Sequence, residues 1–299
     1  MKSFLLALLL LGAGTQSLAA SCCGGGFAFP ALIMGDEKTQ LTSSLSYGQV
    51  TDDVLPNQKW IKRADENHSQ TFKIEAATLI SDTWQTGFSV PVISRSIANE
   101  TSTGLGDISL TLGHETFPEK SYSLWKPKGL TFLQLVVPTS PSIYDATNTL
   151  ASDSRGRGFF TVGGGVALVK VFGRWDANAG VEIHKSFARE FSSPANGGTI
   201  TATPNMGHSW SIGGGWNKGD WRMGSGFTGM YEDAIETSGA QSSRGSSQKN
   251  ITWTTMANYM LSMESAWTLS YADQTLFGSP ENTSLSKTIT ISYQTRWQR

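Results

Sequence analysis

Four residues that can carry charge or move a proton lie at even spacing in one short stretch, and they are Arg174, Asp176, Glu182 and His184. Side chains two residues apart along a β-strand point to the same face, so an extended conformation would place all four on one surface. Arg222 has the matching position in a later segment. On the wall of a passage these groups would form a constriction that selects solutes by charge. They would equally serve as ion pairs that fill and stiffen a narrow interior.

The same residues permit an enzyme as an alternative, because His184 is followed two positions later by Ser186. That spacing corresponds to about 7 Å along a strand. The sequence has no G-x-S-x-G nucleophile motif, and His114 and His208 fall on the apolar face of their segments. The interpretation that we favour is therefore a protein that is not an enzyme and uses no cofactor and no metal.

The elements that would position these residues are β-strands, because apolar and polar residues alternate with period two. In the last segment Leu285, Ile289, Ile291, Tyr293 and Trp297 share one face, and Ser, Thr and Gln residues share the other. Alternation of this kind recurs at 72–80, 84–92, 107–112, 171–184, 206–216, 221–231, 251–261 and 267–271. With the less regular runs 38–51, 128–138 and 157–169, the sequence predicts about twelve strands. Two runs are ambiguous, since 130–137 is apolar on both faces and 159–171 is interrupted by three glycines.

The connections between these segments alternate between short and long along most of the chain. Short turns are expected near 81–82, 170–172, 217–220 and 262–264. Long polar loops are expected near 52–69, 95–102, 139–156, 187–200, 233–248 and 276–284. A strand of about 9–11 residues suffices to cross a membrane in a barrel, and the available length fits this pattern.

Composition indicates which solvent the apolar face meets. The chain has 38% hydrophobic and 16% charged residues, ten tryptophans and a net charge of −1. The net charge gives no case for nucleic acid as a partner. Tryptophans on the apolar face fall near strand ends, as in the aromatic girdle of a membrane barrel. One rim would carry Trp84, Trp175, Trp216, Trp221, Trp267 and Trp297, and the other Tyr231 and Trp253. We therefore expect an all-β, antiparallel up-and-down transmembrane β-barrel.

The N-terminus predicts export. Lys2 precedes an apolar run from Phe4 to Leu11, and small residues follow, which is the pattern of a secretory signal peptide over 1–20. A periplasmic leader would span 21–37 and the barrel 38–299. The only two cysteines, Cys22 and Cys23, are adjacent, so a paired-cysteine metal site is excluded. A lipoprotein signal would place a leucine three residues before its cysteine, whereas Leu18 lies four residues before Cys22. The match is off by one, and lipidation of Cys22 is left open.

The stretch Thr103-Gly104-Leu105-Gly106-Asp107-Ile108-Ser109-Leu110 resembles a strand start found in a bacterial outer-membrane family. This is the family named for the MetA pathway of phenol degradation, whose members are often described as transporters. The resemblance extends loosely over 72–299 and implies a small barrel that passes hydrophobic or small organic compounds. From the residues alone, Gly104 and Gly106 allow a close approach of strands, and Asp107 would form a hydrogen bond or ion pair inside the barrel.

The sequence thus predicts a channel in the bacterial outer membrane, with Asp107, Arg174, Asp176, Glu182, His184 and Arg222 as candidate lumen and selectivity residues. Its expected partners are outer-membrane lipid, the barrel-assembly machinery and a small-molecule solute. Two alternatives remain at this stage. One is a surface structural or adhesive barrel that acts through loops such as 233–248. The other is an outer-membrane barrel hydrolase.

Overall fold

The computed structural model of the protein describes residues 31–119, 121, 123, 125–193, 198–240 and 242–298. The predicted signal peptide, Cys22 and the leader up to residue 30 lie outside the described residues. In the described part every regular element is a β-strand. A search of the same residues for helices long and apolar enough to cross a membrane finds none.

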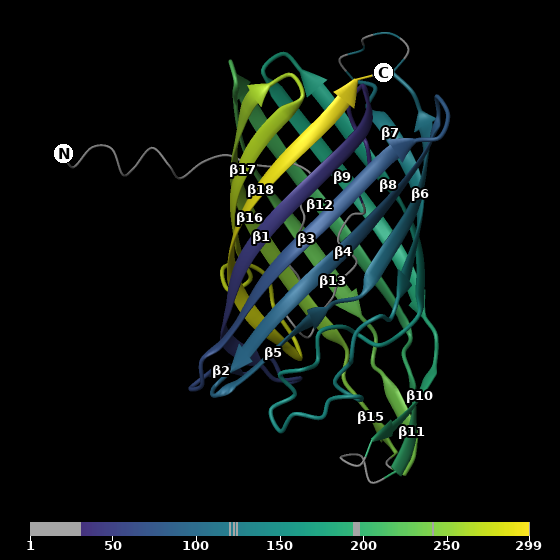
Figure 1. Ribbon diagram of the computed structural model, residues 1–299, viewed down its shortest axis with the longest axis vertical. Coiled ribbons are helices and arrows are strands. Elements are labelled where there is room, and N and C mark those ends of the chain that lie inside the picture. The colour runs from purple at the N-terminus through teal and green to yellow at the C-terminus, as the bar shows by residue number, and fades with distance from the viewer. Residues whose placement is uncertain are drawn as a thin grey trace, which may run out of the picture.

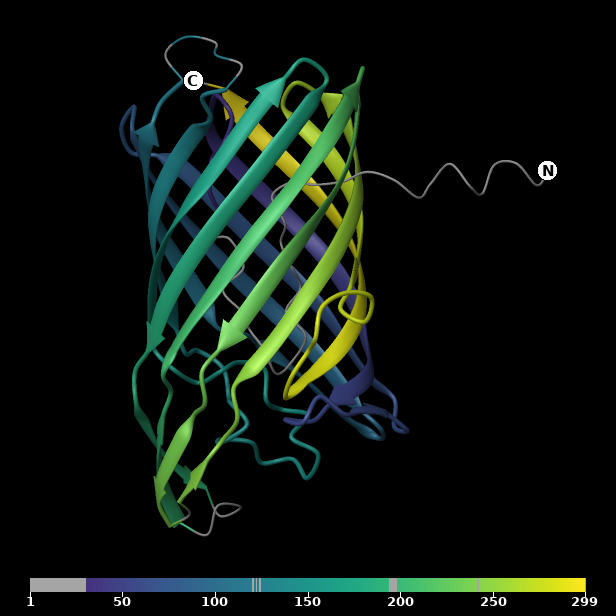
Figure 2. The ribbon, with the colours of Figure 1, turned by 180° about the vertical axis from the view of Figure 1, so that it is seen from behind.

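Twelve strands form a closed ring in which each strand is antiparallel to the next barrel strand along the chain (Figures 1 and 2). The last pairs with the first, from Glu37 opposite Gln298 to Val54 opposite Thr283. The prediction of an up-and-down barrel of about twelve strands is confirmed. The barrel strands are β1 (Glu37–Val54), β3 (Asn67–Leu79), β4 (Trp84–Ile97), β6 (Ile108–Phe117), β7 (Lys128–Val137), β8 (Thr161–Phe172), β9 (Trp175–Ser186), β12 (Met206–Lys218), β13 (Trp221–Glu232), β16 (Gln248–Ser262), β17 (Ser265–Asp273) and β18 (Thr283–Gln298).

The two ends of the barrel differ in their connections. At one end, here called the turn end, β1 begins, β18 ends and short turns join β3 to β4, β8 to β9, β12 to β13 and β16 to β17. The connection 118–127 between β6 and β7 also lies there and is longer. The opposite end, the loop end, carries the long connections and the small strands β2 (Trp60–Lys62), β5 (Glu100–Leu105), β10 (Arg189–Ser193), β11 (Gly198–Thr203), β14 (Glu236–Gly239) and β15 (Ser243–Arg244).

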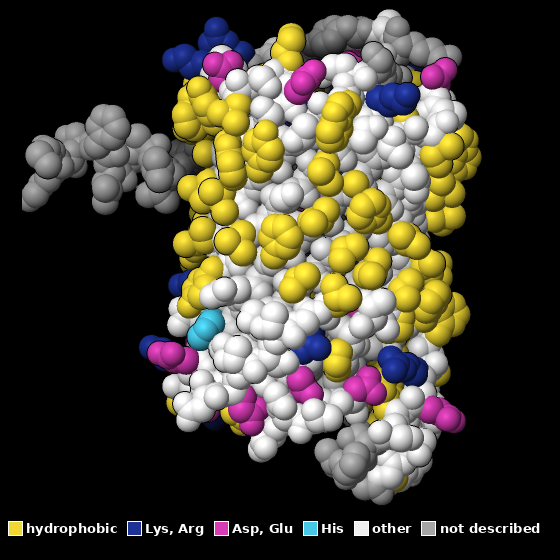
Figure 3. All heavy atoms as spheres, in the orientation of Figure 1, with side chains coloured by type: hydrophobic (Ala, Val, Ile, Leu, Met, Phe, Trp, Pro, Cys, Tyr) yellow, Lys and Arg dark blue, Asp and Glu magenta, His cyan; other side chains and the backbone are white. Residues whose placement is uncertain are grey.

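The alternation of residue types explains the two surfaces of the wall. On β9, Val181 and Ile183 are 55% and 57% exposed, whereas the intervening Glu182 and the following His184 are each 2% exposed. Figure 3 shows hydrophobic side chains over the middle of the barrel and charged side chains near its two ends. Because the ring is closed, each barrel strand is hydrogen-bonded to a neighbour along both edges, and no strand edge is left unpaired in the wall.

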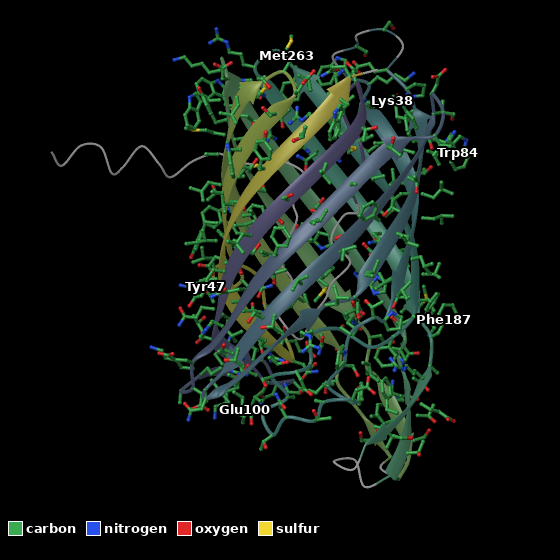
Figure 4. All side chains as sticks on the ribbon, viewed as in Figure 1. Lys38, Tyr47, Trp84, Glu100, Phe187 and Met263 are labelled. Carbon is green, nitrogen blue, oxygen red and sulfur yellow. The ribbon has the colours of Figure 1, made fainter. Side chains whose placement is uncertain are left out.

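Aromatic side chains gather on the outside near the turn end. Trp84, Trp175, Trp221, Trp267 and Trp297 are all exposed, and Figure 4 shows Trp84 pointing away from the barrel close to this end. Trp216 lies there too, half-buried beneath the ammonium group of Lys218. Trp253 lies on the outer face of β16 towards the loop end, where its indole N–H donates to Ser225 Oγ at 2.7 Å.

One residue of the predicted outer face is buried. Leu285 was expected to share the outer face of the last strand with Ile289 and Ile291, but its side chain is 0% exposed. The register between β1 and β18 shifts at this point, between Val50 and Asp52. The extra residue at this step is Thr51 of β1, while β18 continues through Leu285 without a gap.

The strand start that resembles the outer-membrane family is a break in the wall. β5 pairs with the second half of β4, and β6 pairs with its first half, so the chain is interrupted between them at Gly106 and Asp107. Gly106 N–H donates to Pro91 O at 2.8 Å, and a Cβ on Gly106 would lie 2.8 Å from the side chain of Ile93. The glycine therefore lets the chain change direction close against β4 and frees Asp107 for other contacts.

Candidate functional site

The lumen at the loop end contains a chain of charged and polar groups, here called the charged cluster: Arg157, Glu182, His184, Ser209 and Glu232. His184 lies between two carboxylates, with Nδ1 3.0 Å from Glu182 Oε1 and Nε2 3.0 Å from Glu232 Oε1. Arg157 Nη1 donates to the same Glu232 oxygen at 2.5 Å, and Ser209 Oγ donates to Glu182 at 3.1 Å. The cluster therefore balances two carboxylates against a guanidinium and an imidazole inside the barrel.

Arg157 also connects walls that are far apart around the ring. Its guanidinium binds β13 through Glu232, while its backbone N–H donates to Asp107 Oδ2 at 2.8 Å, next to the start of β6. β6 and β13 are the fourth and ninth of the twelve barrel strands, so this one residue links nearly opposite sides. The lumen is accordingly narrowed at the loop end by the β7–β8 connection, residues 138–160.

Further contacts hold this connection to the barrel. Arg95, 5% exposed on β4, donates to the carbonyl oxygens of Ala151 and Ser154 at 3.1 and 3.2 Å. Arg155 donates to Ser102 on β5 at 2.6 Å, in space that a Cβ on Gly104 would fill. Within the connection, burial raises the pKa of the Tyr144 phenol, although nearby Arg157 acts to lower it. Tyr144 packs there against Phe159 and Phe191.

A second ion pair lies near the turn end. Arg222 of β13 binds Asp176 of β9 through two hydrogen bonds, Nη2 to Oδ1 at 2.6 Å and Nε to Oδ2 at 2.8 Å. Asn217 donates to the same carboxylate at 2.9 Å. A guanidinium and a carboxylate in this forked arrangement form one of the stronger side-chain pairs. Arg222 and Asp176, which the alternation in the sequence places on matching faces, are thus in direct contact.

The structure distributes the predicted site residues over three places. Glu182 and His184 belong to the charged cluster, Asp176 and Arg222 form the second pair, and Asp107 lies at the break before β6. Arg174 does not belong with them, because it lies in the β8–β9 turn and is exposed. The inward face that the sequence predicted for Arg174 is therefore wrong, since β9 begins only at Trp175.

The arrangement around His184 differs from what the hydrolase alternative requires. Both of its ring nitrogens face carboxylates, and Ser186 Oγ lies 2.8 Å from Thr161 Oγ1. A base that activates a hydroxyl nucleophile must lie within hydrogen-bond reach of it. Among the described residues, no group of three or more His, Cys, Asp or Glu side chains is placed to hold a metal ion.

Near the turn end the lumen holds a segment of the chain's own backbone. Residues 31–35, here called the inner segment, lie against a strip of the wall formed by Gln85, Gly87, Gly113, Phe132 and Ala167, here called the docking wall. Gln85 binds both backbone groups of Ile33, accepting from its N–H at 2.6 Å and donating to its carbonyl oxygen at 3.2 Å. Gln40 donates to Leu32 O at 3.1 Å, and Lys128 donates to Gly35 O at 3.1 Å.

Apolar side chains of the inner segment and two glycines of the docking wall allow the two to fit closely together. Leu32 and Ile33 are 4% and 2% exposed, and Leu32 packs with Phe132, Ala167 and Met34. A Cβ on Gly87 would lie 2.5 Å from Ala31 O, and one on Gly113 would lie 2.8 Å from Leu32 Cδ2. The two glycines are therefore needed for the backbone to approach the wall.

Sequence reasoning missed several of these residues. Glu232 lies on the same phase of its strand as Arg222, so the alternation carried a signal for it. Arg157 belongs to an irregular connection and gave none. For the docking wall the sequence contains an indirect signal of inward apolar residues, because the run 130–137 is apolar on both faces. Its inward positions Leu130 and Phe132 are 1% and 3% exposed, and the inner segment packs on Phe132.

Fold and lumen together define a closed antiparallel barrel with an apolar outer band and a largely polar interior. The chain is similar to the COG4313 outer membrane channel from Pseudomonas putida F1, with a TM-score of 0.70 and 12% identity over 91% of this chain and 99% of that one. A looser likeness is to the Pseudomonas putida toluene transporter TodX, with a TM-score of 0.48 and 10% identity over 89% and 90% of the two chains. No protein-family model and no curated protein matches the sequence. At 12% identity the likeness to the COG4313 channel shows the fold alone.

Proposed function

We propose that the protein is an outer-membrane channel through which small solutes, hydrophobic ones among them, diffuse passively. The observation that carries this proposal is the closed ring of twelve strands with apolar side chains outside and polar side chains inside. An apolar band meets lipid at low cost, whereas the buried charges of β9 and β13 would be expensive anywhere but in a wet interior.

Three further considerations support the outer membrane as the location. Membrane barrels of this type are found there, with short turns on the periplasmic side and long loops outside. The COG4313 protein, to which this chain is similar in fold, is an outer membrane channel. The N-terminal sequence predicts a cleaved signal peptide, and the stretch 103–110 resembles the MetA-pathway family of outer-membrane transporters. Outer-membrane lipid and the barrel-assembly machinery are then the protein's partners, beside the solute.

Planar-bilayer recording of the refolded protein tests the proposal. The sample is first checked on a gel, where a folded barrel migrates as a compact species before boiling and more slowly afterwards. We expect discrete ion-conducting steps from the folded species and none from the boiled one. A folded barrel that never conducts at any applied voltage would contradict the channel.

One observation favours a second role for the loop end. β10, β11, β14 and β15 form a separate four-stranded sheet that extends beyond the barrel, and Figure 2 shows it as a protrusion. Phe191 and Ile200 of this sheet pack with Phe159 of the β7–β8 connection, so the protrusion is held in place. An ordered surface of this kind suits binding to another cell or a phage. Replacing 190–202 and 236–244 by short turns would abolish such binding and leave conductance in place.

A further inference from the structure

The hydrogen bonds on the inner segment resemble those of a strand edge. Gln85 is 2% exposed and binds both the N–H and the carbonyl oxygen of Ile33, so it recognises main chain rather than a particular side chain. Gln40 adds a bond to the carbonyl oxygen of Leu32. Both glutamines are neutral, and these bonds can be replaced by bonds to water when the segment leaves. The docking wall therefore holds the inner segment in a way that permits exchange.

Beneath Leu32 the wall has an apolar patch. Phe132 and Ala167 face inward, and Leu32 covers them. The ring of Phe132 has room because residue 165 is glycine, where a Cβ would lie 2.7 Å from the ring Cζ. Leu130, 1% exposed, is a further inward apolar residue opposite Ala167, whereas other inward positions nearby are polar or glycine, for example Gln134, Thr111 and Gly113. An apolar patch in a polar passage stays dry only while an apolar group covers it.

We propose that the patch of Phe132 and Ala167 is a binding subsite for a small apolar solute, and that Leu32 is its resident competitor. This proposal rests on the proposed channel function. A solute that takes the place of the leucine side chain removes the contact of Leu32 with Phe132 and Ala167. The segment then leaves the docking wall, and the turn end of the lumen opens. A ligand shifts such an equilibrium only through its preference for one state, and here the preference arises because the solute and the Leu32 side chain compete for the same contact with Phe132 and Ala167.

Benzene is a suitable probe, because apolar cavities lined by aliphatic and aromatic side chains bind it. Cys22 and Cys23 are first replaced by serine, and Ile33→Cys then places a single thiol on the inner segment, where the native side chain is 2% exposed. The rate of labelling by a membrane-impermeant maleimide reports how often the segment leaves the wall. With benzene at about ten times its dissociation constant, we expect the rate to rise about tenfold.

Two variants show whether benzene acts by competition. In Leu32→Ala/Ile33→Cys the leucine side chain no longer competes with benzene while the segment is bound, so benzene should no longer change the labelling rate. Thr252→Cys places a thiol at another buried lumen position, on β16. Its labelling should be equal with and without benzene, because the probe does not act on that strand. Glycerol, a polar molecule of small size, should have no effect on any variant.

A rate for Ile33→Cys that is independent of benzene would overturn the subsite, as would an equal acceleration at Thr252→Cys. Folding of each variant is checked by the gel shift, and the cysteine-free chain with native Ile33 gives a second readout in bilayers, where benzene should lengthen the open periods. Labelling that responds in a barrel that never conducts would reject the channel and leave the subsite standing. Conductance without any response to benzene would reject the subsite and leave the channel standing.

Discussion

The charged cluster and the docking wall lie on different parts of the same lumen and are satisfied in different ways. On β9, β12 and β13 the inward groups bind other side chains, and Glu232 accepts from both His184 and Arg157. On β4, β6, β7 and β8 the inward groups bind the main chain and one leucine of the inner segment. Charges buried together depend on each other and are costly to separate. Hydrogen bonds to the main chain, most of them from neutral glutamine side chains, and a small apolar contact are cheaper to exchange.

This difference indicates that the two regions have separate roles. The charged cluster, with Asp107 and Arg157, fixes the β7–β8 connection and the shape of the loop end. The docking wall holds a segment that has no place in the ring of strands and whose loss leaves every strand pair intact. Changes in the cluster should therefore act mainly on stability, and changes in the docking wall mainly on the passage.

The largest effect is expected from Glu232→Gln. The substitution leaves Arg157 and His184 facing a neutral group in a site where the carboxylate side chain is 7% exposed. Removing one partner of a buried ion pair should lower the free energy of unfolding by about 3 kcal/mol. Urea unfolding of the barrel in detergent micelles measures the change. Glu236→Gln is the matched control, because its ion pair with Arg244 is largely exposed, with side chains 52% and 72% accessible, and should cost less than about 1 kcal/mol. Equal losses in the two variants would show that burial of the cluster contributes nothing.

Adding one methyl group to each region gives a more direct comparison. In Gly207→Ala the new Cβ would lie 2.4 Å from His184 Nε2 and 2.6 Å from Glu232 Oε2, so the cluster must shift. We expect a loss of about 1–3 kcal/mol in the free energy of unfolding. In Gly87→Ala the Cβ would lie 2.5 Å from Ala31 O, and the inner segment can move away. That variant should raise conductance in bilayers at little cost in stability. The reverse result, with Gly87→Ala unfolding easily and Gly207→Ala conducting more, would contradict the separate roles of the charged cluster and the docking wall.

The two regions also differ in how far the sequence predicted them. Strict alternation identified the barrel, because a wall between lipid and water imposes a period of two on every strand. For the same reason it predicted the inward positions of Glu182, His184, Asp176 and Arg222. It failed at Arg174, which lies one position before its strand, since a turn boundary leaves no mark on the alternation. For the docking wall the only signal was the run 130–137, which is apolar on both faces. Its pairing with the inner segment could not be predicted, because a contact between distant residues has no local pattern.

A smaller effect is expected from the second ion pair. Asp176→Asn removes the carboxylate that holds Arg222, and an unpaired guanidinium then faces the lumen near the turn end. The positive charge attracts anions, so the reversal potential across a gradient of potassium chloride should move towards anion selectivity. Arg174→Ala is the matched control, because that side chain is exposed in the turn and should leave selectivity unchanged. A larger shift in Arg174→Ala than in Asp176→Asn would place the selective charge in the turn.

The smallest effect concerns Glu119, in the connection between β6 and β7 at the turn end. A hydrogen bond from Lys170 lowers the pKa of this carboxyl group, although partial desolvation acts to raise it. The contact therefore contributes stability that is complete above the ordinary glutamate value of about 4.3 and is lost as the pH falls through the lower value of the folded protein. An NMR titration of the carboxyl carbon should give a midpoint below the ordinary value, and Lys170→Met should return it towards that value. A midpoint that is unchanged in Lys170→Met would show that another group holds the carboxylate.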